Sequence, residues 1–154
     1  LGDRQTIATA KARYEGYLEE LIAQGVPLDQ QLVALDLRGM EAARETAHRL
    51  LLLPDPPTAF LTAQNLLTIG TVHALRERAQ HRSVALVGFD DILLADLLDP
   101  AITVIAQDPP EIGRVAAETL FRRLDGDRSP TAHVVVPTRL IPRGSGEIRP
   151  VPNR

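Results

Sequence analysis

Three polar side chains stand where an α/β sheet would hold a small ligand. Asp90 directly follows an apolar run that ends at Gly88, and Asn65 follows another run that ends near Thr62. Arg13 lies one to two turns into the first predicted helix. Because ligands of open α/β sheets bind beyond the carboxyl ends of the strands, these three side chains could all face one crevice.

Asp90, Asn65 and Arg13 would offer complementary hydrogen-bonding groups. A carboxylate, an amide and a guanidinium supply acceptors, mixed groups and forked donors, a set that suits a polyhydroxylated or heterocyclic small molecule. Each residue also has a purely structural interpretation. Asp90 and Asn65 could cap the helices that follow them, and Arg13 could be a solvated helix residue.

An enzymatic use of this region is a weaker hypothesis. Asp90 and Asp91 are adjacent carboxylates, and His48 or His73 could assist them in a hydrolase or isomerase. Consecutive side chains generally point apart, however, and both histidines lie in helical patterns that favour a structural or surface role. The sequence has no glycine-rich nucleotide-binding motif, and Ser145 lacks the flanking strand and helix of a nucleophile elbow. Binding without catalysis is therefore expected, with no catalytic residue.

Composition narrows the class of protein further. A chain of 154 residues, 44% of them hydrophobic, can bury one sizeable core. The absence of cysteine excludes disulfides and thiolate metal sites and is compatible with a cytoplasmic protein. A net charge of -3 and 3% aromatic residues argue against nucleic-acid binding by this chain alone. The apolar runs are far shorter than the roughly 20 residues that span a bilayer, so no membrane association is expected.

Helices and strands alternate along the chain and would position the three polar residues. Apolar spacing predicts helices from Ile7 to Gln24, Gly39 to Leu53, Leu66 to Arg78 and Pro110 to Leu124, with a short helical turn around 93–97. Apolar runs predict strands at 32–35, 58–62, 83–88, 102–105, 134–136 and 138–141. This alternation implies an α/β fold with a doubly wound, mostly parallel sheet.

A series of short motifs runs through the chain in a fixed order. The motifs are RYEGY at 13–17, PTAFLTAQN at 57–65, VALVGFDD at 84–91, PAITVIAQ at 100–107 and VPTRLIPRGS at 136–145. Each motif alone is weak, but their order and spacing resemble the C-terminal half of the sensor domain of LacI/GalR regulators over nearly the whole chain. The resemblance implies a periplasmic-binding-protein-like type I sensor fold.

The resemblance also implies a function and a site. Family members are DNA-binding transcriptional regulators, often repressors, whose small effector, such as a sugar, alters operator binding; no cofactor or metal is implied. The family's matching residues make Arg13, Asn65 and Asp90 the expected effector-binding residues. Leu66 departs from the family pattern, which usually has an acidic residue there, and this puts sugar specificity in doubt. A stand-alone periplasmic-type solute-binding protein is the alternative, although the 136–145 motif favours the regulator.

The same resemblance leads us to expect a partial domain and a dimer. Residues 1–154 would be mainly the C-terminal subdomain of an effector-binding domain, with about 107–124 crossing towards an absent first subdomain. Operator DNA would bind only through an absent N-terminal helix-turn-helix. A homodimer would form through the helix from Leu66 to Arg78 and the apolar segment from Ile92 to Leu98, which could instead merely cover the sheet edge.

Overall fold

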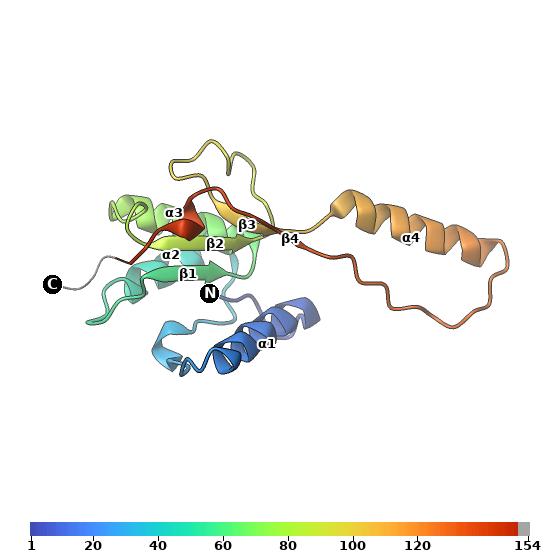
Figure 1. The fold of residues 1–154 in the computed structure, drawn as a ribbon, viewed down its shortest axis with the longest axis horizontal. Coiled ribbons are helices and arrows are strands. Elements are labelled where there is room, and N and C mark those ends of the chain that lie inside the picture. Colours follow the sequence, from blue (N-terminus) through green and yellow to red (C-terminus); the bar gives the residue numbers. More distant parts are fainter. Residues whose placement is uncertain (151–154) are drawn as a thin grey trace.

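The protein alternates helices and strands, as a computed structural model that describes residues 1–150 shows (Figure 1). Its helices are α1 (Ala8–Ala23), α2 (Gly39–Leu50), α3 (Asn65–Glu77) and α4 (Pro109–Leu124). Its strands are β1 (Ala59–Thr62), β2 (Ala85–Phe89), β3 (Thr103–Ala106) and β4 (Arg139–Ile141). Two short 3-10 helices are η1 (Gln30–Leu32) and η2 (Ser145–Glu147). The four long predicted helices are therefore confirmed, with small shifts at their ends.

The strands form one mixed, mostly parallel sheet in the order β1-β2-β3-β4. β1, β2 and β3 run parallel, and β4 pairs antiparallel with β3. Thr62 lies opposite Gly88, and Phe89 lies opposite Ile105. This register brings the carboxyl ends of the three parallel strands to a single edge, and it confirms the predicted fold class.

The core lies between this sheet and the pair of helices α2 and α3. Leu50 of α2 and Leu75 of α3 join Leu86 and Val104 of the sheet in one buried cluster. The two helices approach closely at Gly70, where a Cβ atom would lie 2.1 Å from the carbonyl oxygen of Met40. α1 lies apart from them, beside β1 (Figure 1).

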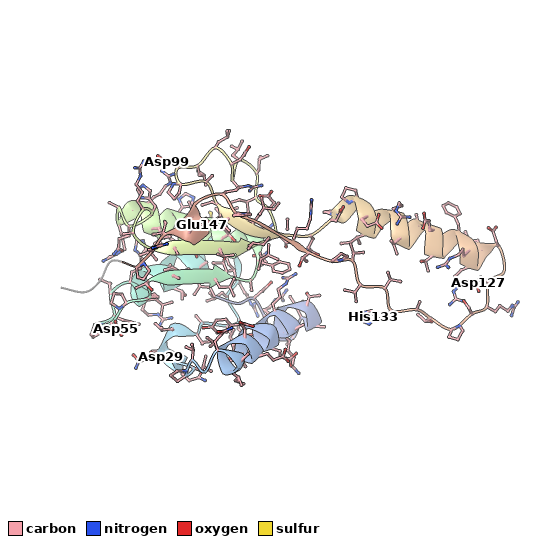
Figure 2. The ribbon with its side chains drawn as sticks, in the orientation of Figure 1. Asp29, Asp55, Asp99, Asp127, His133 and Glu147 are labelled. Carbon is pink, nitrogen blue, oxygen red and sulfur yellow. The ribbon has the colours of Figure 1, made fainter. Side chains whose placement is uncertain are left out.

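Helix α4 extends away from the sheet, and residues 125–138 return beside it (Figure 1). No residue of α4 is buried, although the helix carries the apolar side chains of Leu120, Phe121 and Leu124. Figure 2 shows Asp127 and His133 far out on this arm. The predicted crossing over 107–124 thus corresponds to a helix that leaves the body of the described structure.

Two predicted segments have a different structure. The segment 93–97 forms turns instead of helix, because Leu94 takes a φ of 66°, which a right-handed helix cannot accommodate. The predicted strand at 134–136 is irregular, and its side chains project into solvent because no strand of the described residues lies beside it.

The predicted strand at 32–35 is also wrong. Its first residue belongs to η1, and Val33 caps that turn by donating a backbone hydrogen bond to Gln30. Only one hydrogen bond ties the rest of this run to a neighbour, from the Gly2 nitrogen to the Ala34 oxygen at 2.8 Å. The run is extended and apolar, but it lacks the continuous ladder that defines a strand.

Candidate functional site

Arg13 joins α1 to the carboxyl ends of two strands. Its Nη1 donates a hydrogen bond of 2.8 Å to the carbonyl oxygen of Ala63, directly after β1. Its guanidinium carbon lies 3.8 Å from the ring centroid of Phe89, the last residue of β2. An arginine held over an aromatic face in this way is both oriented and partly desolvated. It is therefore not the freely solvated helix residue of the alternative interpretation.

Asp90 lies at the next step along the same edge. Its backbone nitrogen donates to the carbonyl oxygen of Ile105 at 3.0 Å, so the residue still belongs to the sheet edge. Its φ of 68° is a left-handed conformation that aspartate tolerates better than most residues. This conformation directs the half-buried carboxylate towards Gln107, whose side-chain amide donates a hydrogen bond to it.

Asn65 begins α3 without being its N-cap. Gln64 is the capping residue, and its side-chain oxygen accepts hydrogen bonds from the nitrogens of Leu66 and Leu67 at 3.0 and 3.3 Å. The Asn65 Oδ1 accepts only from the adjacent Leu66 nitrogen, at 2.8 Å. The helix start is thus already satisfied by Gln64, which weakens the capping interpretation of Asn65.

Asp91 has a different role from its neighbour Asp90. Both of its carboxylate oxygens accept hydrogen bonds from Arg143, at 2.7 and 2.6 Å. The Arg143 guanidinium lowers the pKa of the Asp91 carboxyl below its ordinary value. Asp90 therefore binds Gln107 while Asp91 binds Arg143. This agrees with the expectation that the two consecutive carboxylates do not form an acid/base pair.

The histidines considered for catalysis lie elsewhere. His48 on α2 makes a 2.6 Å contact through Nε2 with the carboxylate of Glu77 on α3. His73 is an exposed residue of α3. Within residues 1–150, no three His, Asp or Glu side chains are grouped so that they could hold a metal ion. The same residues include no helix long and apolar enough to cross a membrane.

Two residues at this edge were missed as site residues. Gln107 directly follows β3 and donates to Asp90, while Phe89 ends β2 and supports Arg13. Gln107 could have been found by the rule that located Asp90, because it too follows a strand at the carboxyl edge. The role of Phe89 depends on a contact with α1, which the local sequence does not reveal.

A cavity of about 250 Å³ lies next to this edge, between α1, residues 32–35 and β1. Its lining is largely apolar and includes Leu1, Ala10, Tyr14, Tyr17 and Ala59. Of the three predicted site residues, only Arg13 borders it. The cavity therefore lacks the combination of acceptors and donors that characterises the strand-end edge.

Comparisons with known proteins agree with the fold and the motifs. A model of the periplasmic binding protein-like domain matches residues 1–146. The chain is 31% identical over 140 residues to the HTH-type transcriptional repressor CytR of Escherichia coli (strain K12), covering 90% of this chain and 41% of that protein. It thus spans about two fifths of the length of this curated relative.

Solved structures give the same result. A regulatory protein of the LacI family from Chloroflexus aggregans superposes with a TM-score of 0.86 at 26% identity, covering 96% of this chain and 54% of that one. A complex of the transcriptional regulator CelR with cellobiose gives a TM-score of 0.85 at 28% identity, covering 95% and 45%. These matches confirm the resemblance to LacI/GalR regulators. The chain belongs to the periplasmic binding protein-like domain family.

Proposed function

We propose that this chain is the effector-binding part of a LacI-type transcriptional repressor, and that it binds a small polar effector such as a sugar. The observation that carries the proposal is the position of the Arg13 guanidinium, which is bound to Ala63 and packed on Phe89. That position holds a forked donor at Ala63 and Phe89, which precede Asn65 by two residues and Asp90 by one in the sequence. Donors and acceptors held on a rigid sheet edge suit ligand hydroxyl groups.

The comparisons support a regulator over a stand-alone solute-binding protein. The related CytR is a helix-turn-helix repressor, and the similar CelR structure contains cellobiose. We infer that this chain likewise acts by binding and performs no catalysis. Operator DNA would be contacted by a separate segment, and the protein would work in the cytoplasm.

Leu66 sets a limit on the effector. This side chain is exposed beside Asn65 at the start of α3, where it offers apolar contact instead of a polar partner. An effector with an apolar face next to its hydroxyl groups suits this arrangement better than one that is polar all round. Nucleosides combine an apolar face with hydroxyl groups in this way, so they are tested together with sugars.

The signal would pass through the two segments that connect the sheet to α4, one leaving β3 and the other returning to β4, at the same edge. An effector that binds Asp90 competes for the carboxylate that Gln107 now occupies, immediately before α4. Residues 1–154 would then be one part of a larger effector-binding domain, with 107–124 belonging to the other subdomain. The effector changes operator affinity to the extent that it binds one arrangement of the subdomains more tightly than the other.

A homodimer is the proposed assembly. The segment from Ile92 to Leu98 carries Leu93 and Leu97 with 90% and 74% of their surfaces exposed. This segment is joined to α3 by Arg76, which donates a hydrogen bond to the Asp99 carbonyl oxygen at 3.1 Å. Exposed leucines in such numbers are typical of a surface that a partner covers.

Thermal unfolding of the full-length regulator with a panel of ligands tests the proposal. The panel contains cellobiose, lactose, sugar phosphates and nucleosides, each at increasing concentration. A ligand at 100 times its dissociation constant should add about 2.7 kcal/mol of stability. This shift should be lost in Asp90→Ala and kept in Asp55→Ala, since Asp55 lies before the start of β1 (Figure 2). A shift that persists in Asp90→Ala would place the effector elsewhere.

A further inference from the structure

Two threonine hydroxyl groups meet in the interior, where β1 ends. The Oγ1 of Thr62, the last residue of β1, lies 2.8 Å from the Oγ1 of Thr68 on α3, and both residues are 0% exposed. The Thr62 Oγ1 also lies 3.4 Å from the carbonyl oxygen of Val87 on β2. The Thr68 Oγ1 lies 3.2 Å from the carbonyl oxygen of Gln64. Thr62 and Thr68, which we call the threonine pair, thus link β1, β2 and the start of α3.

The threonine pair has two hydroxyl hydrogens for these three contacts. When Thr68 donates to Thr62, the Thr62 hydroxyl donates to the Val87 oxygen. When Thr62 donates to Thr68, the Thr68 hydroxyl donates to the Gln64 oxygen. In both arrangements each hydrogen has an acceptor and the two hydroxyl groups are bonded to each other. A buried polar network that is satisfied in this way favours one arrangement of the elements around it.

The backbone of β2 packs directly against this pair. A Cβ atom added at Gly88 would lie 2.7 Å from the Thr68 Oγ1 and 2.9 Å from the Thr68 Cγ2, so no side chain fits between β2 and α3 at this point. Such close packing leaves little room for adjustment. The threonine pair therefore sets the spacing between the end of β2 and α3.

Both ends of the threonine pair lead to residues of the proposed effector site. Val87 precedes Asp90 by three residues, and Gln64, the N-cap of α3, immediately precedes Asn65. We propose that the threonine pair positions this site, because its hydroxyl groups hold the start of α3, with Asn65, at a fixed distance from the end of β2, with Asp90. The inference rests on the proposed function and adds two positioning residues that do not themselves touch the effector.

The hydroxyl groups of the pair contribute geometry more than stability. Valine has nearly the shape of threonine and is buried without the cost of desolvating a hydroxyl group. Replacing both partners of a buried hydrogen bond by apolar groups of the same shape is close to neutral for stability, whereas replacing one partner leaves the other unsatisfied. Apolar contacts are not directional, so two valines would hold the same elements at a less definite spacing.

Two double variants of the full-length regulator separate geometry from stability. Thr62→Val with Thr68→Val removes both hydroxyl groups. It should weaken effector binding on the order of fivefold, with Tm within about 2 °C of the natural value. Thr62→Ser with Thr68→Ser keeps both hydroxyl groups and removes two buried methyl groups. It should lower Tm by about 4 °C or more and leave the affinity unchanged.

Affinity is measured by calorimetric titration with the compound of the sugar and nucleoside panel that stabilises the natural regulator. Thr71→Val is the matched control for the loss of a buried hydroxyl group. Thr71 is also 0% exposed, but its hydroxyl donates to the Leu67 oxygen within α3, at 2.9 Å. Because this bond stays within one helix, Thr71→Val should not change the effector affinity.

Hydrogen exchange gives a second measurement that needs no ligand. The Leu66 and Leu67 amides donate to the Gln64 side chain at the start of α3, at 3.0 and 3.3 Å. Their exchange should be on the order of fivefold faster in the double-valine variant, because the helix start is held less firmly there. The double-serine variant and Thr71→Val should exchange at these amides as the natural regulator does.

The opposite results would overturn the proposal. A double-valine variant that binds the effector as tightly as the natural regulator would do so. A double-serine variant whose affinity falls together with its Tm would do so as well, since the methyl groups would then matter instead of the hydroxyl groups. If no panel compound binds the natural regulator, the proposed function fails. The exchange rates at the start of α3 then decide the inference, and equal rates in the natural and double-valine proteins overturn it.

Discussion

Arg143 holds Asp91 in a two-pronged ion pair, with Nη1 and Nη2 2.7 and 2.6 Å from the two carboxylate oxygens. The pair joins the segment that follows β4 to the loop that follows β2. It therefore fixes the backbone next to Asp90, the residue proposed to bind the effector. Arg143 is only 19% exposed, so water competes less for this pair than for a fully exposed one.

Arg143→Ala should destabilise the fold by about 1 kcal/mol, because Asp91 loses its partner while remaining near solvent. Arg143→Lys should recover only part of this loss, since lysine cannot bind both carboxylate oxygens in parallel. Urea unfolding measures both variants. Arg82→Ala is the matched control, because the Arg82–Asp99 pair is exposed on both sides and its loss should be close to neutral.

The stability contributed by Asp91 should depend on acidic pH. The Arg143 guanidinium lowers the folded-state pKa of this carboxyl below its ordinary value of 3.8. The contribution is therefore present above pH 3.8 and lost as the pH falls through the lower, folded-state pKa. The unfolding free energies of the natural chain and of Asp91→Asn, measured between neutral pH and strong acid, should converge at the acid end. A constant difference throughout would contradict this assignment.

The Leu1 amino group should give the 154-residue chain a second pH dependence of the same sign, near neutrality. Its pKa falls from 8.0 to about 6 on folding, so the unfolded chain binds more protons between these values. Stability should therefore rise as the pH increases from 6 to 8, by up to about 3 kcal/mol. Calorimetry across this range measures the effect, and acetylation of the amino group should abolish it.

Gly70 and Gly113 form a matched pair of helical glycines. Gly70→Ala should be strongly destabilising, on the order of 3 kcal/mol, because the new Cβ would lie 2.1 Å from the Met40 oxygen and 2.9 Å from the Ala43 side chain. Gly113→Ala in α4 meets no atom within 4 Å and should instead favour the helix by about 1 kcal/mol. Chemical denaturation of the two variants distinguishes the packed helix pair from the exposed arm.

The sequence was informative about the strand-end residues because parallel strands end at a common edge. Asp90 and Asn65 were placed there by a rule that needs only the direction of the strands, whereas Arg13 was placed by its position in the first predicted helix. Gln107 satisfied the same rule and was overlooked as a site residue. Whether any of these residues contacts an effector stays a prediction.

The errors have a common physical cause. Apolar spacing does not encode long-range pairing, so the run at 32–35 looked like a strand although a single hydrogen bond, from Gly2 to Ala34, joins it to an extended neighbour. Apolar spacing also does not encode the sign of the backbone angle φ. The leucine-rich turn fails as a helix because Leu94 has a positive φ, which depends on how the loop packs and not on its hydrophobicity.

The chain leaves for α4 and returns from it through neighbouring strands, with Ala106 of β3 paired to Arg139 of β4. The arm formed by α4 and residues 125–138 is therefore joined to the sheet at this pair of adjacent strands, which we call the hinge line. Gln107, which binds Asp90, is the first residue beyond that hinge line. A change of one hydrogen bond at Asp90 would therefore act at the pivot, where a small displacement produces the largest movement at the far end of α4.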